Sequence, residues 1–365
     1  MVERSVKQLK LIFVFAGFAY RPIGGYKVAY QYVNFLSERG HKVQIVHGIS
    51  KDAKATNDIV ARFFSLVFKR FRKCVLPWFN LSKAVQVNFI GHISNLALQD
   101  SDAVVLVGFT ATQQLNKSNF QNIPGGGIFV QLDQHPDLLN ITSSFEEIVG
   151  VFKQKNILHV SIPGIVQEML SDIGLKSHAI APGVDSEKFY HKGINSQKLS
   201  VLTFKSNIEH KAFSVAVEAM RYVHHEMPEV DFYCFGSETV LDIPDWITDL
   251  GYLSDEKLSD AYNRSSIFLV ASSEEGFGLT ALEAMSCGSV VVSTKNGGVQ
   301  SFLEDGVNSK LAEIGDSAGL AESCIVILRD RNLLRELSVN AVSASANYSL
   351  DVSNSKFEEF LLNLK

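Results

Sequence analysis

The sequence lacks the marks of a disulfide-bonded, metal-binding or membrane-spanning protein. Its four cysteines, Cys74, Cys234, Cys287 and Cys324, show no C-x-x-C spacing, and three of them fall in apolar strand or helix patterns. We therefore expect structural thiols in a reducing compartment. No apolar run reaches about 18 residues, so no transmembrane helix is expected.

The amino terminus has only part of an export signal. Lys7 and Lys10 precede an apolar run from Leu11 to Tyr20. The run is short, lacks a small-x-small cleavage site and leads into an amphipathic helical pattern. We interpret it as the first strand of a Rossmann-type domain.

Neither positive nor negative charge dominates the sequence. The net charge is -5 and the pI is about 6.1, so no global basic field is available to hold nucleic acid. The chain has 365 residues, of which 46% are hydrophobic. That length predicts two domains, and the composition supplies a core for each.

Strand-like apolar runs alternate with helical patterns in both halves of the chain, which predicts an α/β protein with parallel sheets. In the first half we expect strands at 9–15, 42–47, 103–108, 127–131 and 157–161. In the second half we expect them at 201–203, 231–235, 267–271 and 290–293.

The most informative stretch is 272–288, SSEEGFGLTALEAMSCG. A buried strand pattern ends just before it, and a helical pattern covers Leu279 to Cys287. Glycines at the start of a helix leave free N–H groups and a partial positive charge that suit an anion. Glu275 and Glu283 flank this turn, and carboxylates suit vicinal hydroxyls. An isolated E-x7-E pair can also be a surface loop and a solvent-facing helix residue.

Residues 251–305 closely resemble the donor half of the retaining GT-B glycosyltransferases, the glycosyl transferases group 1 family of E-x7-E type. A Gly-aromatic turn, a helix, a strand, Glu-Gly-Phe-Gly, Glu-Ala-Met, a Val-rich strand and a Gly-Gly turn occur in the family order. The resemblance implies two Rossmann-like domains facing across a cleft, with a last helix that crosses back to the N-domain. We place the acceptor domain at 1–180, the donor domain at 181–348 and the helix at 349–365.

The same resemblance implies a donor site. The family places two basic residues against the diphosphate, the first most often Arg and the second Lys. The corresponding residues here are Lys205 and Lys211. Lys205 lacks the planar fork of Arg, and either lysine alone can be a solvated surface residue. The family's Gly-Gly turn after the first strand corresponds to Gly24 and Gly25. The donor-binding residues that we expect are Gly24, Gly25, Gly276, Phe277, Gly278, Leu279, Thr280, Glu283 and Tyr252.

Catalytic groups follow from the same comparison. Relatives place a His or Asp after the fourth strand, where this chain has Asp133 and His135. His135 can instead be a turn residue before Pro136. The catalytic residues that we expect are Glu275, Lys211, Lys205, Asp133 and His135. No metal-ligand spacing is present, so we predict no metal and no cofactor besides the nucleotide-sugar substrate.

Residues 61–84 combine five phenylalanines and a Trp with basic residues, in a protein of net negative charge. This pattern is typical of a segment that lies on an anionic membrane or holds a lipid-linked acceptor. The alternative is that its aromatic residues belong to the core of the domain.

We therefore predict a cytoplasmic, metal-independent, retaining glycosyltransferase, peripheral on the inner face of the membrane. It moves a hexose or deoxyhexose from a nucleoside diphosphate sugar to a glycan or lipid-linked glycan of a surface polysaccharide. It has some likeness to rhamnosyltransferases and mannosyltransferases. Three alternatives stay open: a nucleotide-sugar epimerase, a dinucleotide-binding dehydrogenase and a non-catalytic sugar-binding subunit.

Overall fold

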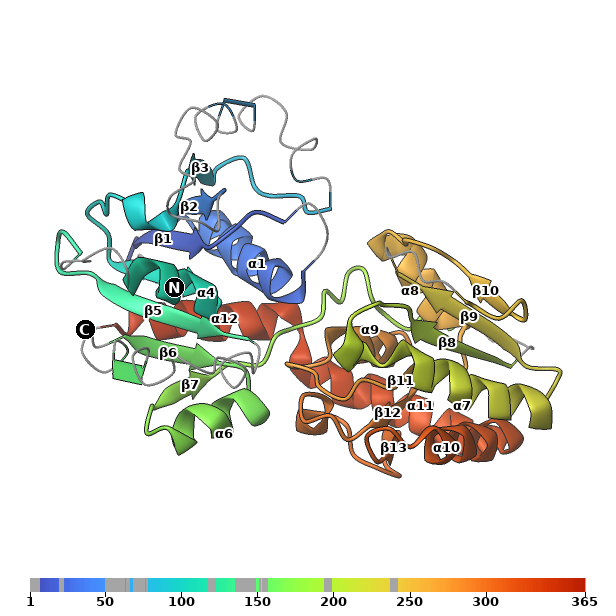
Figure 1. Ribbon diagram of the computed structural model, residues 1–365. Coiled ribbons are helices and arrows are strands. Elements are labelled where there is room, and N and C mark those ends of the chain that lie inside the picture. The colour runs from blue at the N-terminus through green and yellow to red at the C-terminus, as the bar shows by residue number, and fades with distance from the viewer. Residues whose placement is uncertain are drawn as a thin grey trace, which may run out of the picture. The chain divides into compact units, whose positions relative to one another are not determined.

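The computed structural model describes residues 7–19, 23–49, 63, 66–67, 76, 78–116, 123–134, 149–150, 152, 157–193, 199–236 and 242–364. The chain divides into two compact units (Figure 1). Unit 1 comprises Met1–Ala181 and Ser353–Lys365, and unit 2 comprises Pro182–Val352. Each unit contains one parallel β-sheet with helices, as the alternating sequence pattern predicts.

The sheet of unit 1 has the strand order β3-β2-β1-β4-β5-β6-β7. The central strands are apolar and buried, as parallel strands covered on both faces must be. The strands are β1 (Lys10–Phe15), β2 (Lys42–Gly48), β3 (Gln86–Ile90), β4 (Ala103–Val107), β5 (Ile128–Asp133), β6 (Leu158–Ser161) and β7 (Ser177–Ala179).

The helices of unit 1 include α1 (Gly24–Glu38), α4 (Phe109–Asn116), α6 (Ile165–Asp172) and the greater part of α12 (Leu350–Leu362). Two buried contacts attach α12 to this unit. The hydroxyl groups of Tyr32 and Ser353 lie 3.0 Å apart. Nδ1 of His41 accepts the backbone N–H of Leu9, so Nε2 carries the proton and donates to Glu358 at 3.0 Å.

The sheet of unit 2 has the order β10-β9-β8-β11-β12-β13. Its strands are β8 (Ser200–Phe204), β9 (Asp231–Phe235), β10 (Ile247–Asp249), β11 (Ile267–Val270), β12 (Val290–Thr294) and β13 (Ser309–Ala312). Its helices include α7 (Phe213–Glu226), α8 (Asp255–Arg264), α9 (Leu279–Ser286), α10 (Ser317–Arg329) and α11 (Arg331–Ser345). A core cluster beneath α7 and α10 joins one apolar face of its strands.

The three cysteines in the described part of the chain, Cys234, Cys287 and Cys324, are buried free thiols. Burial is the main cause that raises the pKa of each to about 12. These thiols are therefore protonated and structural, as the sequence predicts. None of the described helices combines the length and the apolar character that crossing a bilayer needs.

Candidate functional site

Two predicted groups meet at the carboxyl edge of the unit 2 sheet. Lys211 lies in the short 3-10 helix η4 (Glu209–Lys211) after β8, and Glu275 lies in the loop after β11. Strands β8 and β11 are parallel neighbours, so their carboxyl ends share one edge of the sheet. Nζ of Lys211 lies 2.7 Å from Oε2 of Glu275, and Ser272 donates to Oε1 at 2.8 Å. Both oxygens of this carboxylate are therefore held in place.

The loop that carries Glu275 is fixed by its backbone. The N–H of Ser273 donates to the carbonyl of His210 at 2.8 Å, and the hydroxyl of Thr294 donates to the carbonyl of Ser272. Gly298 also packs against this loop, because a Cβ at that position would lie 2.5 Å from the carbonyl oxygen of Glu275. A side chain there would displace the backbone that positions the carboxylate.

Helix α9 begins at this edge. Gly278 precedes it with φ at 95°, in the left-handed region that favours glycine, and no side chain caps the helix. The half-buried Leu279 and Thr280 therefore present their N–H groups at a helix amino terminus, which is electropositive. Phe277 has a different role, because its ring is buried against Phe302 with centroids 5.0 Å apart.

Glu283 lies one turn into α9 and is 5% exposed. Its negative charge adds to the effect of burial, the larger cause, in raising the pKa of both Tyr262 and Cys287. The carboxylate is thus enclosed next to α8, which excludes the alternative of a solvent-facing helix residue.

Lys205 is also buried, at 4% exposure, so the alternative of a solvated surface residue is wrong. Its Nζ lies 2.6 Å from Oδ2 of Asp249, the last residue of β10. Oδ1 of Asp249 accepts the N–H of Gly251 at 2.9 Å. Although partial burial opposes it, hydrogen bonding to Lys205 and Gly251 lowers the pKa of Asp249. No pattern in the sequence singles out Asp249.

Tyr252 follows this pair and is 56% exposed. Tyr252 follows β10, which is two strands away from β8, and it lies at the same carboxyl edge of the sheet. This position agrees with a role on the donor side but does not test it. It stays a prediction.

In unit 1 one expectation needs correction. Gly24 and Gly25 do not form a loop between the first strand and the first helix, because they are the first two residues of α1. The two glycines differ in surroundings. A Cβ on Gly24 would meet nothing within 4 Å, whereas one on Gly25 would lie 2.7 Å from Oε1 of Gln134.

Asp133 is the last residue of β5 and is 3% exposed. Its Oδ2 lies 2.7 Å from Nδ1 of His159 in β6, a partner that sequence reasoning missed. His135 lies outside the described residues. Within the described ranges no three His, Cys, Asp or Glu side chains group to hold a metal ion, and metal independence stays a prediction.

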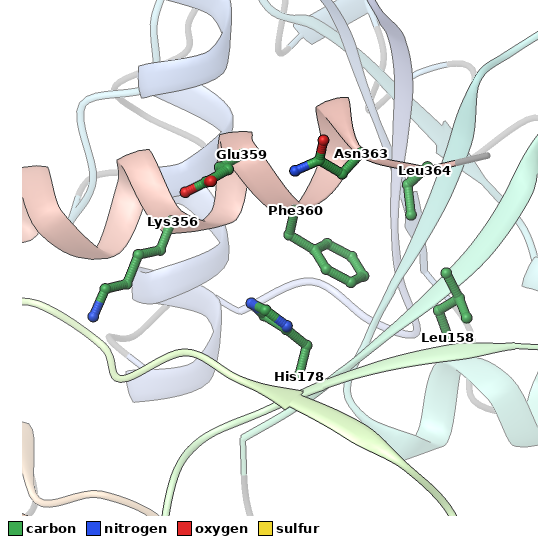
Figure 2. Close-up of a pocket in the computed structure, with 7 residues that line it drawn as sticks. All are labelled: Leu158, His178, Lys356, Glu359, Phe360, Asn363 and Leu364. Carbon is green, nitrogen blue, oxygen red and sulfur yellow. The ribbon is translucent and has the colours of Figure 1, made fainter.

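A pocket of about 340 Å³ lies elsewhere in unit 1, between α12 and strands β6 and β7 (Figure 2). The rings of His178 and Phe360 are 5.2 Å apart at its centre, and Lys356 and Glu359 also line it. None of the residues predicted for the site lines this pocket.

Comparison with known proteins finds a family match for part of the chain. Residues 200–330 match the model described as Glycosyl transferases group 1. N-acetyl-alpha-D-glucosaminyl L-malate synthase of Bacillus anthracis is 34% identical over 101 residues, which cover 28% of this chain and 26% of that protein. The lipopolysaccharide core biosynthesis glycosyltransferase LpsE of Rhizobium meliloti is 26% identical over 205 residues, 52% of this chain and 59% of LpsE. The chain thus spans less than two thirds of either relative.

Among solved structures, HepE from Anabaena in complex with UDP-glucose superposes with a TM-score of 0.74 at 16% identity, covering 97% of this chain and 99% of HepE. The chain has the GT-B fold. Unit 2 of this GT-B chain carries the group 1 match, and the groups around Glu275 and α9 lie inside it. The prediction of a GT-B architecture is confirmed.

Proposed function

We propose that the chain is a retaining, metal-independent glycosyltransferase that moves a hexose or deoxyhexose from a nucleoside diphosphate sugar to a glycan acceptor. The main observation behind this proposal is that Lys211, Glu275 and the start of α9 lie at one edge of the unit 2 sheet. All three lie within the residues that match the group 1 family model. Such an edge is where α/β sheets bind their ligands.

The chemistry of these groups fits the leaving diphosphate. Free N–H groups at the start of α9 and the ammonium of Lys211 supply donors where negative charge develops on the departing phosphate. The enclosed carboxylate of Glu283 suits a pair of hydroxyls on the donor. These groups perform the charge stabilisation that a divalent cation performs in other enzymes, which supports metal independence.

Retention of configuration needs no nucleophilic carboxylate in this proposal. In a front-face reaction the departing diphosphate takes the proton of the acceptor hydroxyl, and the protein supplies position and charge. The salt bridge of Glu275 to Lys211 leaves this carboxylate engaged with a cation, which suits a positioning role rather than attack on the sugar.

A role in surface polysaccharide synthesis is the finer part of the proposal. It is supported by the name of LpsE, a lipopolysaccharide core biosynthesis glycosyltransferase. We assign the acceptor side to unit 1, at the carboxyl end of β5 beside the first turn of α1. We propose that the protein acts at the cytoplasmic face of the membrane.

The segment 61–84 divides into two parts within its described residues. Leu76 and Leu81 are buried, and Trp78 packs on Tyr30 with ring centroids 5.7 Å apart, which agrees with the core alternative for this end. Phe63 and Leu66 are 63% and 68% exposed. We propose that the earlier part, which the sequence surrounds with basic residues, touches an anionic membrane.

Liposome flotation tests the membrane contact. Phe63→Ser/Leu66→Ser should reduce flotation with anionic vesicles, while Val339→Ser, which removes a 61% exposed side chain from α11, should not. Equal flotation of all three proteins would refute the contact.

A thermal-shift panel tests the transferase. UDP-glucose, GDP-mannose and dTDP-rhamnose are each added to the full chain, and at least one should raise the melting temperature, because a ligand that binds only the folded state stabilises it. The same nucleotide sugar should then donate to a glycan acceptor. Conversion of the nucleotide sugar without acceptor would instead identify an epimerase, and binding without any turnover would identify a non-catalytic subunit.

A further inference from the structure

The carboxyl end of β5 presents two neighbouring polar residues that differ in accessibility. Asp133 is 3% exposed, and the next residue, Gln134, is half-buried. Gln134 lies beside the first turn of α1, at the same carboxyl edge where β1 and β4 end. Of the two, Gln134 is the one that a ligand can reach.

Asp133 is held inward by a buried pair. Its Oδ2 lies 2.7 Å from Nδ1 of His159, and the two side chains are 2% and 1% exposed. An ionised carboxylate can only accept a hydrogen bond, so Nδ1 carries the proton and donates. The rings of Phe152 and His159 pack edge to face with their centroids 4.5 Å apart, and this contact fixes the plane of the imidazole.

A second contact secures the same strand. Gln131 in β5 pairs with His159 in the β5–β6 register, and its Oε1 accepts the hydroxyl of Thr112. The end of β5, which Gln134 follows, is thus held by side chains of α4 and β6. A fixed strand end gives the following residue a defined position.

Only one of the two adjacent glycines, Gly25, lies close to the side chain of Gln134. A Cβ on Gly25 would lie 2.7 Å from Oε1 of Gln134, inside van der Waals contact, and a Cβ on Gly24 would meet nothing within 4 Å. Gly25 has no left-handed φ that would itself require glycine. A Cβ at this position would therefore displace the amide of Gln134, the end of a flexible side chain, rather than the backbone.

We propose that Gln134 binds a sugar hydroxyl through its side-chain amide, and that Gly25 is glycine to leave room for that amide. The inference rests on the proposed function, since it takes the ligand to be a sugar. An amide carries both a donor and an acceptor, so it can bind a hydroxyl in either sense. The hydroxyl belongs to the transferred sugar or to the acceptor.

The test uses four variants of the full chain: Gly150→Ala, Gly25→Ala, Gln134→Ala and the double variant Gly25→Ala/Gln134→Ala. The substrate is whichever of the three panel nucleotide sugars stabilises the wild type, with its glycan acceptor. Gln134→Ala and Gly25→Ala should each lower kcat/KM roughly tenfold, the loss of one hydrogen bond. Gly150→Ala is the control and should stay within about twofold of the wild type, since a Cβ there would also meet nothing within 4 Å.

The double variant separates displacement of Gln134 from a direct clash with the ligand. Once Gln134 is truncated, the Cβ at position 25 has space, so the double variant should match Gln134→Ala. Weaker binding of the nucleotide sugar with unchanged binding of the free nucleotide would assign the hydroxyl to the transferred sugar. A raised KM for the acceptor alone would assign it to the acceptor.

Melting temperatures provide the structural control, and all four variants should unfold close to the wild type. Full activity of Gln134→Ala in an active wild-type background would overturn this inference and leave the proposed function intact. So would a double variant whose loss is the product of the two single losses. A wild type that binds no nucleotide sugar would overturn both proposals.

Discussion

Lys211 and Glu275 form a salt bridge of 2.7 Å between residues that are 64 positions apart in sequence. Ser272 occupies the other oxygen of the carboxylate. The ammonium of Lys211 keeps two further N–H donors, which can meet an anion at the adjacent start of α9. The pair therefore orients a cation toward the place where we propose that phosphate binds.

Replacing Lys211 should mainly affect the reaction. Lys211→Met removes a donor to the leaving diphosphate and should lower kcat/KM by on the order of 100-fold, about 3 kcal/mol at the transition state. Lys295→Met is the matched control, because Lys295 forms an exposed salt bridge in the same unit. Steady-state transfer measures both, and equal activity of the two variants would contradict a phosphate role for Lys211.

Asp249→Asn leaves the buried ammonium of Lys205 without its carboxylate. We expect a loss of roughly 1 to 3 kcal/mol in the free energy of unfolding, the cost of an unpaired buried group. A bound diphosphate would replace the missing partner, so the nucleoside diphosphate should raise the melting temperature of Asp249→Asn more than that of the wild type. A smaller shift in the variant would show that Lys205 does not meet phosphate.

The buried side chain of His47 should make the stability of the fold sensitive to acid. Its Nδ1 donates to the carbonyl of Gly17 and its Nε2 accepts from Tyr30, so the buried ring is neutral. Burial lowers the pKa of His47 from 6.5 to about 4. Between these values the unfolded chain binds the proton and the folded chain does not, so stability falls as the pH falls from about 6.5 to about 4. The difference between these two pKa values corresponds to about 3 kcal/mol.

Urea unfolding at pH 7 and at pH 4.5 measures this dependence. His47→Gln removes the titrating ring, and its loss of stability between the two pH values should be smaller than that of the wild type. An unchanged loss would assign the acid sensitivity to other groups.

Gly298→Ala should disturb the site through the backbone. The new Cβ would lie 2.5 Å from the carbonyl oxygen of Glu275, and that oxygen cannot move without its loop. We expect both a lower melting temperature and weaker binding of the nucleotide. Binding as tight as in the wild type would mean that the position of Glu275 is unimportant for the ligand.

The sequence predicts the central strands well and the edge strands poorly. The strands that apolar patterns did not reveal are β3, β7, β10 and β13, and these are the four outer strands of the two sheets. An edge strand pairs on one side only and need not be apolar on both faces. The burial patterns of β7 and β10 show mostly exposed residues, so their sequences carry no strong periodic signal.

The candidate site shows the same division. Glu275 and Glu283 belong to one motif in a short stretch of sequence, and Lys211 corresponds to a separate basic position of the family, so the sequence points to all three. Asp249 and His159 could not be predicted, because their importance comes from long-range pairing with Lys205 and Asp133, 44 and 26 positions away. No local pattern distinguishes these residues from other polar residues at strand ends.

The most direct test of the account is calorimetric titration of UDP, GDP and dTDP into three proteins: the wild type, Glu283→Gln and Glu322→Gln. Glu322 is an exposed residue of α10 and serves as the control. We predict that one nucleotide binds the wild type and Glu322→Gln equally and binds Glu283→Gln at least tenfold more weakly, with all three unliganded melting temperatures similar. Equal affinity for Glu283→Gln, or no binding to the wild type, would contradict a donor site on the second unit.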